Sequence, residues 1–285
     1  MYNRSMNRLS LKKKARVISA LVEGNSILAT CRITGTAKGT VLRLLRDVGK
    51  ACAEYQDKHL RNIPCKHMQC DEIWSFCYAK QKNVPENKQG QLGYGDVWTW
   101  TAIDADTKLV PCWLIGLRNA TYAYRFMADL RSRLANRVQL TTDGHKLYLW
   151  AVEDAFGGEI DYAMLVKLYG QEPDNTKRYS PAQCIGANPT IIQGNPYPAK
   201  ISTSFVERQN LTMRMSMRRF TRLTNASSKK IENLEYVVAL HFVYYNFARP
   251  HKTLTNPYPK TPAMAAGISN HIWTVKEIVN LVELL

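Results

Sequence analysis

The chain has 285 residues, of which 45% are hydrophobic and 10% aromatic, so it is long and apolar enough to bury a folded core. This composition excludes a disordered chain, and the interrupted apolar stretch 236–248 is too short to span a bilayer. The formal net charge of +16 is the remaining bulk feature that needs an explanation.

The positive charge is concentrated in two blocks. Residues 1–66 contain 14 Lys and Arg against 4 Asp and Glu, and residues 200–230 contain 8 against 1. The segment 67–199 between them is nearly neutral, with 13 against 14. A basic block gains affinity for a polyanion by counterion release, so this pattern favours double-stranded DNA as a partner over a merely solvated basic face.

The compartment is indicated by the start of the chain and by the cysteines. The start, MYNRSMNRLSLKKKARV, lacks the apolar core of a signal peptide. Seven cysteines without regular spacing suggest reduced thiols, and Cys65, His67 and Cys70 lack a second ligand pair at zinc-finger spacing. We therefore expect a cytoplasmic protein that makes no membrane contact.

Residues 9–60 predict three helices. A first apolar run at helical spacing ends at Gly24, and Ser26 can cap a short second helix. Gly35 ends this second helix, and Thr36 can cap a third.

Helix, short helix, turn and longer basic helix is the order of a helix-turn-helix module. Residues 1–63 are therefore predicted to bind DNA, with an all-α protein-contact module as the alternative. Besides Thr36, the start of the third helix would present to DNA the side chains of Lys38, Thr40 and Arg43.

A second unit, residues 64–285, begins at Pro64 and predicts a mixed α/β domain. Three strands, a helix, a strand and a helix is an order that suits the ribonuclease-H-like fold, in which parallel strands and flanking helices follow an antiparallel meander. The expected elements are strands 67–79, 96–104 and 108–117, a helix over 121–136, a strand over 138–143, a helix over 146–156, and a segment 160–169 of either type.

The last third of the chain predicts a loop and then helices. Residues 171–200 hold five of the twelve Pro, which predicts a long structureless insertion. A long basic helix is expected over 202–222, and 232–248 predicts a second helix that begins a helical C-terminal tail.

Three acids suit metal-dependent phosphodiester chemistry, in which two divalent cations activate the attacking oxygen and neutralise the leaving one. Asp71 lies within an otherwise apolar strand, where a charge is costly unless it is paired or metal-bound. Asp143 ends a strand before Gly144, and Glu207 lies near the start of the basic helix. If the two strands are neighbours, the three carboxylates can meet at one edge of the sheet.

Each acid also has a structural explanation. Asp143 could be only a turn residue, and Glu207 could form a capping box with Ser204. Asp71 could face outward on an edge strand and leave Glu72 as the inward acid.

The basic helix adds a second signal. Arg214 and Arg218 follow Glu207 by seven and eleven residues, so the predicted helix places both on the same face as Glu207. Cations behind a metal-binding carboxylate suit a bound phosphate backbone, although the face could simply be solvated. The basic surface would be extended by Arg208, Arg219 and Arg222.

Three segments, CDEIWSF, TTDG and VERQNLTMRMSMRRFTRLT, resemble the motifs of the DDE transposases of the insertion-sequence-one family, over about residues 68–230. The resemblance implies a ribonuclease-H-like core with Asp71, Asp143 and Glu207 as catalytic metal ligands. It also implies that Arg214 is the basic residue that follows the Glu, and that Asn210 contacts DNA.

Two departures from this family are visible. Its founding type has an N-terminal zinc finger, whereas this segment looks like a zinc-free helix-turn-helix. The tail, YYNFARPHKTL followed by TPAMAAGI, is similar to the ends of integrase-type transposases. These departures concern how DNA ends would be recognised.

The resemblance implies a transposase that cleaves and transfers the DNA of an insertion sequence with two Mg²⁺ ions, or Mn²⁺ in their place. Its partners would be element ends and target DNA, and its form a homodimer or larger, in the nucleoid of a bacterial or archaeal cell. Without a P-loop, no nucleotide cofactor is expected. The alternatives are an inactive DNA-binding repressor and a purely hydrolytic nuclease.

Overall fold

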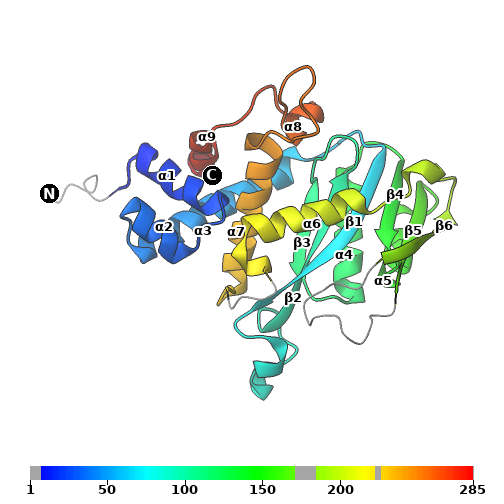
Figure 1. The fold of residues 1–285 in the computed structure, drawn as a ribbon, viewed down its shortest axis with the longest axis horizontal. Helices are drawn as coiled ribbons and strands as arrows, with labels where there is room; N and C mark the ends of the chain where they lie inside the picture. The colour runs from blue at the N-terminus through cyan, green and yellow to red at the C-terminus, as the bar shows by residue number, and fades with distance from the viewer. Residues whose placement is uncertain (1–7, 171–183, 222–225, 285) are drawn as a thin grey trace.

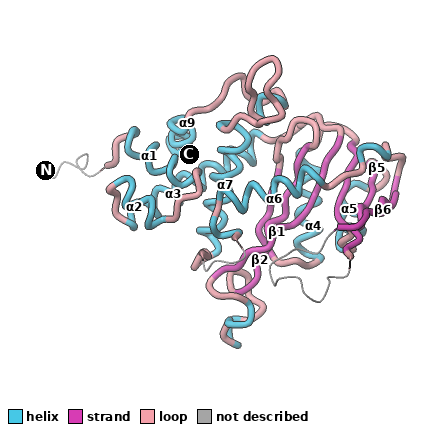
Figure 2. The backbone as a smooth tube through the Cα atoms, in the orientation of Figure 1, coloured by secondary structure: helices cyan, strands magenta, loops and turns pink. Residues whose placement is uncertain are grey.

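The computed structural model describes residues 8–170, 184–221 and 226–284. Three helices open the chain (Figures 1 and 2): α1 Leu11–Val22, α2 Ile27–Thr34 and α3 Lys38–His59. The predicted cap of α2 is confirmed, because the Ser26 side chain accepts the N–H of Ala29. The predicted cap of α3 is wrong: Ala37 precedes the helix, and Thr36 is buried with its N–H and hydroxyl bonded back to Cys31 and Thr34.

The sheet starts as an antiparallel meander and continues with parallel strands. β1 His67–Cys77 pairs with β2 Gly95–Asp104, which pairs with β3 Cys112–Gly116. β4 Val138–Asp143 lies parallel to β1, and β5 Ile160–Tyr169 lies parallel to β4. The strand order β3-β2-β1-β4-β5-β6 confirms the mixed ribonuclease-H-like fold and settles 160–169 as a strand.

The sixth strand corrects one expectation. β6 Cys184–Gln193 pairs antiparallel with β5, so these residues are not the structureless loop predicted for 171–200. Pro189 is tolerated because an edge strand leaves one side of its backbone unpaired. Residues 171–183 of the expected insertion lie outside the described residues.

Helices cover both faces of the sheet (Figure 1). α4 Ala120–Arg133 and α5 Leu147–Phe156 pack together on one face, where the buried Trp100 of β2 lies 5.9 Å from Phe126 and 5.6 Å from Tyr148, ring centroid to centroid. α6 Ser204–Ser216 crosses β1 and β2 on the other face. The predicted long helix therefore ends at Ser216, well before residue 222.

The C-terminal helices join the N-terminal ones to the sheet. α7 Ile231–Val243 continues as a π-helical turn, Tyr244–Ala248, and packs against α3, while α9 Val275–Asn280 packs against α1. None of the described helices is long and apolar enough to cross a membrane. The shorter helical segments are Gln81–Asn83, Glu86–Lys88, Pro198–Lys200, Arg218–Phe220, α8 Pro262–Ala265, α9 Val275–Asn280 and Leu281–Leu284.

Candidate active site

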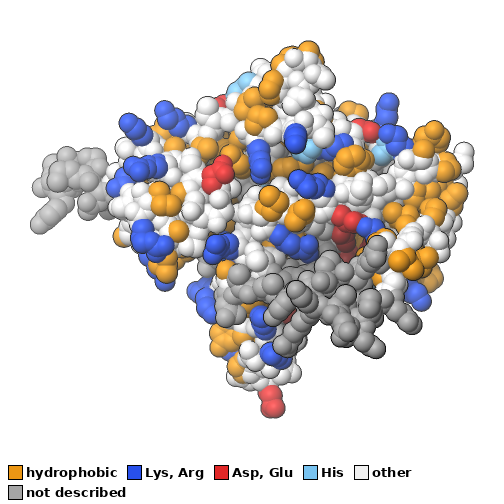
Figure 3. Space-filling model, in the orientation of Figure 1, with side chains coloured by type: hydrophobic (Ala, Val, Ile, Leu, Met, Phe, Trp, Pro, Cys, Tyr) orange, Lys and Arg blue, Asp and Glu red, His pale blue; other side chains and the backbone are white. Residues whose placement is uncertain are grey.

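The three predicted acids line one cleft of about 770 Å³. Cys70 of β1 pairs with Thr142 of the parallel β4, so the residues that follow them, Asp71 and Asp143, lie at neighbouring positions. Acidic side chains are visible beside the right-hand end of α6 in Figure 3. The cleft is lined by Asp71, Arg118, Asp143, Gly144, His145, Leu165, Val166, Lys167, Tyr169, Thr203, Glu207, Asn210, Leu211 and Arg214.

Two side chains of β1 hold α6 over the sheet. Gln69 and Asp71 are two residues apart and therefore point to the same face of the strand. The Gln69 Oε1 atom accepts the N–H of Phe205 at 2.8 Å and that of Val206 at 3.1 Å. Asn210 Nδ2 donates to Asp71 Oδ2 at 2.8 Å. The Gln69 contacts satisfy two N–H groups at the start of the helix, and together with the Asn210 contact they fix Glu207 between them.

Asn210 lies in the cleft beside Asp71. The sequence resemblance suggested a DNA contact, but Asn210 is only 4% exposed and its amide is bonded to Asp71. No local sequence pattern indicates the contact between Asn210 and Asp71, and the DNA contact of Asn210 stays a prediction.

Glu207 is held in the cleft by a hydroxyl and an ammonium group. Thr203 Oγ1 donates to Glu207 Oε1 at 2.6 Å, and Lys167 forms an ion pair with Oε2. Burial lowers the pKa of Lys167, but the hydrogen bond and charge of Glu207 outweigh it and raise that pKa. The alternative capping box with Ser204 is not formed, because Ser204 is itself the first helical residue.

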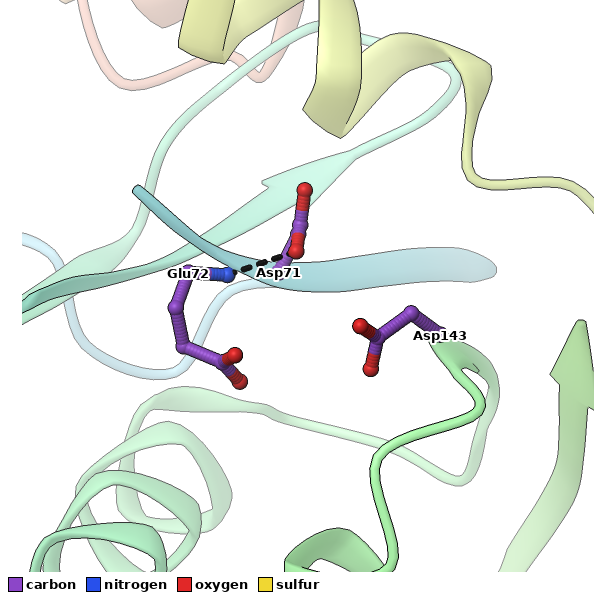
Figure 4. Close-up of side chains that lie close together, drawn as sticks. All are labelled: Asp71, Glu72 and Asp143. Atoms are coloured by element: carbon purple, nitrogen blue, oxygen red, sulfur yellow. Dashed lines mark hydrogen bonds between the residues drawn. The ribbon is translucent and has the colours of Figure 1, made fainter. Parts of the chain in front are cut away.

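Glu72 is a fourth carboxylate near the cleft, on the opposite face of β1. Ligand atoms of Asp71, Glu72 and Asp143 all lie within 4.8 Å of one another, and Figure 4 shows the side chains of Asp71 and Glu72 pointing away from each other. The Glu72 side chain is 0% exposed, and Arg118 Nε donates to its Oε2 at 3.0 Å. Burial raises the pKa of Glu72 to about 7.

Asp71 lies where its ionisation is opposed. Burial, followed by the charge of Asp143, raises the pKa of Asp71 to about 7, although the N–H of Glu72 donates to Oδ1 at 2.8 Å and lowers it. Arg118 approaches Asp143 as well, with 3.9 Å between Nη2 and Oδ2. A cation placed among these carboxylates would favour their ionised forms.

The predicted basic residues fall into different environments. Arg214 lines the cleft as expected, and Arg208 is exposed on another side of α6. Arg218 does not share their helix, because the chain is extended at Met217, and it borders a separate cavity. Arg219 is half-buried, and its Nε donates to Ser228 Oγ at 2.8 Å.

DNA contacts were also predicted at the start of α3 and at Arg222. At the start of α3, Lys38 and Arg43 are exposed and Thr40 is half-buried. Arg222 lies outside the described residues.

Several residues of the cleft were not predicted from the sequence. Arg118 follows β3, Lys167 lies on β5, and Thr203 precedes α6, so the fold alone brings them together. The available signal was Lys167, which with Asp161 is one of two charged residues in the segment 160–169, whose secondary structure the sequence left open.

No protein-family model matches this sequence, and no curated protein matches it. Among solved structures, it is similar to a chain of the simian T-cell lymphotropic virus intasome in complex with PP2A regulatory subunit B56 gamma, at 14% identity, over 92% of this chain and 77% of that chain, with a TM-score of 0.40. The piggyBac transposase synaptic complex with hairpin DNA matches at 11% identity over 99% and 73%, with a TM-score of 0.40. The Mos1 strand transfer complex matches at 12% over 57% and 60%, with a TM-score of 0.25. At these values the likeness assigns no role to any residue.

Proposed function

We propose that this chain is a DDE-type transposase, which cleaves DNA at the ends of an insertion sequence and joins them to target DNA. The observation that carries the proposal is that Asp71, Asp143 and Glu207 line a single cleft although they come from β1, β4 and α6. Arg118 and Lys167 line the same cleft, so it offers both carboxylates and cations.

The donor set fits hard divalent cations. Carboxylate oxygens are the ligands that Mg²⁺ and Mn²⁺ prefer. Burial and then the charge of Asp143 raise the pKa of Asp71, and a bound cation would offset both effects. We assign Asp71, Asp143 and Glu207 as the residues that would hold two such ions. When bound, the ions would activate the attacking oxygen and neutralise the leaving one.

The protein's own side chains would orient the substrate. Arg118 and Arg214 line the cleft from two sides and would bind non-bridging phosphate oxygens. Asn210 holds the Asp71 carboxylate in one orientation by its hydrogen bond. Lys167 neutralises Glu207 in the structure described here and would release it to a metal ion.

We assign DNA recognition to residues 1–63. Lys38 and Arg43 are exposed at the start of α3, where a recognition helix would present them with Thr40. Because two ends of one element must be joined to one target, the active form is proposed to be at least a dimer.

The test is a cleavage and strand-transfer assay with Mg²⁺ on a plasmid that carries the gene with its flanking DNA. Asp71→Asn, Asp143→Asn and Glu207→Gln should each abolish nicked and joined products, while DNA binding measured in Ca²⁺ persists. Glu72→Gln is the matched control: it should keep measurable product, because its side chain is fully buried and paired with Arg118.

Other outcomes would identify the alternatives. Loss of product in Glu72→Gln but not in Glu207→Gln would replace Glu207 by Glu72 in the ligand set. Nicking without joining would indicate a hydrolytic nuclease, and DNA binding without either product would indicate a repressor.

A further inference from the structure

A second cavity lies on another side of α6 from the acidic cleft. Glu207 and Arg214 line the cleft, whereas Arg208 and Thr212 of the same helix line a cavity of about 360 Å³. Residues one apart on a helix differ by about 100° in direction, so neighbours such as Glu207 and Arg208 face different cavities. α6 is therefore a wall shared by both.

Basic side chains from three segments converge on this second cavity. Lys108 comes from the turn between β2 and β3, Arg208 from α6, and Arg249, His251 and Lys252 from the segment that follows α7. Among the residues that the structure describes, none of those lining the cavity is acidic. We call these five residues the basic pocket.

The exposed cations of the basic pocket lack acidic partners. None of the ion pairs formed by the described residues involves Arg208, Arg249 or Lys252. Burial, and then the positive charges of Lys108, Arg249 and Arg208, lower the pKa of His251. Their mutual repulsion is unfavourable in the free protein, and a bound anion would relieve it.

The pocket is built by buried contacts. Tyr245 Oη donates to the Lys108 carbonyl at 3.1 Å, and the Asn246 amide bonds both the N–H and the C=O of Val110, at 3.0 and 2.9 Å. The Lys108 ammonium lies 3.7 Å from the centroid of the Phe205 ring. These contacts fix the segment after α7 and α6 against the β2–β3 turn, so the backbone that carries the cations is held in place.

We propose that the basic pocket binds phosphodiester groups of a DNA strand that passes over α6 into the acidic cleft. This inference rests on the proposed function, because it takes the strand in the cleft to be DNA. In Figure 3 blue and pale-blue side chains gather above α6, while red ones lie at its right-hand end. A helix is about 10 Å wide and strand phosphates are spaced by about 3.4 Å along the axis, so the pocket would hold phosphates about three nucleotides from the reacting one.

The test measures DNA affinity of the full chain over a series of KCl concentrations, without divalent metal, with a fluorescein-labelled duplex. Each phosphate contact contributes about −0.9 to the slope of log K against log[salt], so Arg208→Ala/Arg249→Ala should make the slope shallower by about 2. Arg208→Lys/Arg249→Lys should keep the wild-type slope. A control with the same charge change, Lys82→Ala/Lys276→Ala, removes two exposed cations elsewhere and should leave it unchanged.

A wild-type slope in a folded Arg208→Ala/Arg249→Ala protein, with an unchanged melting temperature, would overturn the proposal. The proposal would also be overturned if the Arg208→Ala/Arg249→Ala protein lost binding of inorganic pyrophosphate while its DNA slope stayed unchanged. The pocket would then bind a free anion and not a DNA strand. Repeating the titration in the Asp71→Asn background separates the two proposals. If the slope changes in that background but the wild-type protein cleaves no DNA, only the proposed enzymatic activity is refuted, and the proposed DNA-binding role of the basic pocket stands.

Discussion

At the residue scale, Asp71 shows what it costs the fold to place a carboxyl group beside a second one. Asp71 is half-buried beside Asp143, and burial followed by the charge of Asp143 raises its pKa from 3.8 to about 7. At a pH between these two pKa values, Asp71 keeps a proton in the folded protein that it has lost in the unfolded chain. Raising the pH from about 4 to 7 without metal therefore lowers the contribution of Asp71 to stability, and the loss is complete above the folded pKa.

Asp71→Asn should remove this penalty. In chelator at pH 8 we expect the variant to melt at a higher temperature than the wild type, with a difference that shrinks toward pH 4. Mg²⁺ should raise the melting temperature of the wild type at pH 8 and leave that of the variant unchanged. Asp154→Asn, at an exposed position of α5, is the control and should change neither. Equal melting of wild type and Asp71→Asn in chelator at pH 8 would contradict the prediction.

At the scale of elements, the crossing of α3 and α7 depends on one glycine. A Cβ atom at Gly49 would lie 2.5 Å from Tyr236 Cβ and 2.7 Å from its Cα, and a backbone cannot give way as a flexible side chain can. Gly39, in the same helix, has no neighbouring atom within 4 Å of such a Cβ. Alanine substitutions at the two positions therefore separate the effect of packing on stability from the effect of helix propensity.

Gly49→Ala should lower the free energy of unfolding by about 1–3 kcal/mol through overpacking. Gly39→Ala should leave it unchanged or raise it by up to about 1 kcal/mol, because alanine favours the helix. Urea denaturation of both variants measures the difference. Equal stabilities would mean that the helices adjust their crossing without cost.

The elements also show what the sequence could predict. β4 was predicted at its observed bounds, because β-branched residues end at an Asp-Gly turn. β6 was missed because Pro189 and Gly186 suggested a loop, and only its pairing with β5 makes it a strand. The end of α6 was missed because good helix formers continue past Ser216. The three acids were predicted from local pattern and from the resemblance, which also named Asn210, whereas the contacts that Asn210 and Arg118 make depend on the tertiary fold.

At the scale of the whole molecule, the N-terminal helices share a core with the C-terminal ones. Apolar residues of α1, α3, α7 and α9 belong to the same buried cluster as those of the sheet. The boundary expected at Pro64 therefore does not interrupt the packing of the core. It separates only the two roles that we propose, DNA recognition before it and catalysis after it.

Calorimetry of the full chain should show one unfolding transition, because separating α3 from α7 would expose buried apolar surface on both. Gly49→Ala should lower the temperature of that single transition as a whole. Two resolved transitions, with only the first shifted by Gly49→Ala, would show that residues 1–63 unfold independently.

The alternation of β1 has a consequence for folding fidelity. Ten consecutive residue pairs, from Met68 with Asp104 to Cys77 with Gly95, set the alignment of β1 on β2. A slip by one residue would turn Glu72 toward α6 and send Asp71 to the side of Tyr148, and Gln69 would lose the helix start. A strand in the wrong register would thus fail to bind α6. The hydrogen bonds that shape the cleft therefore also disfavour folded states in which β1 is misaligned on β2.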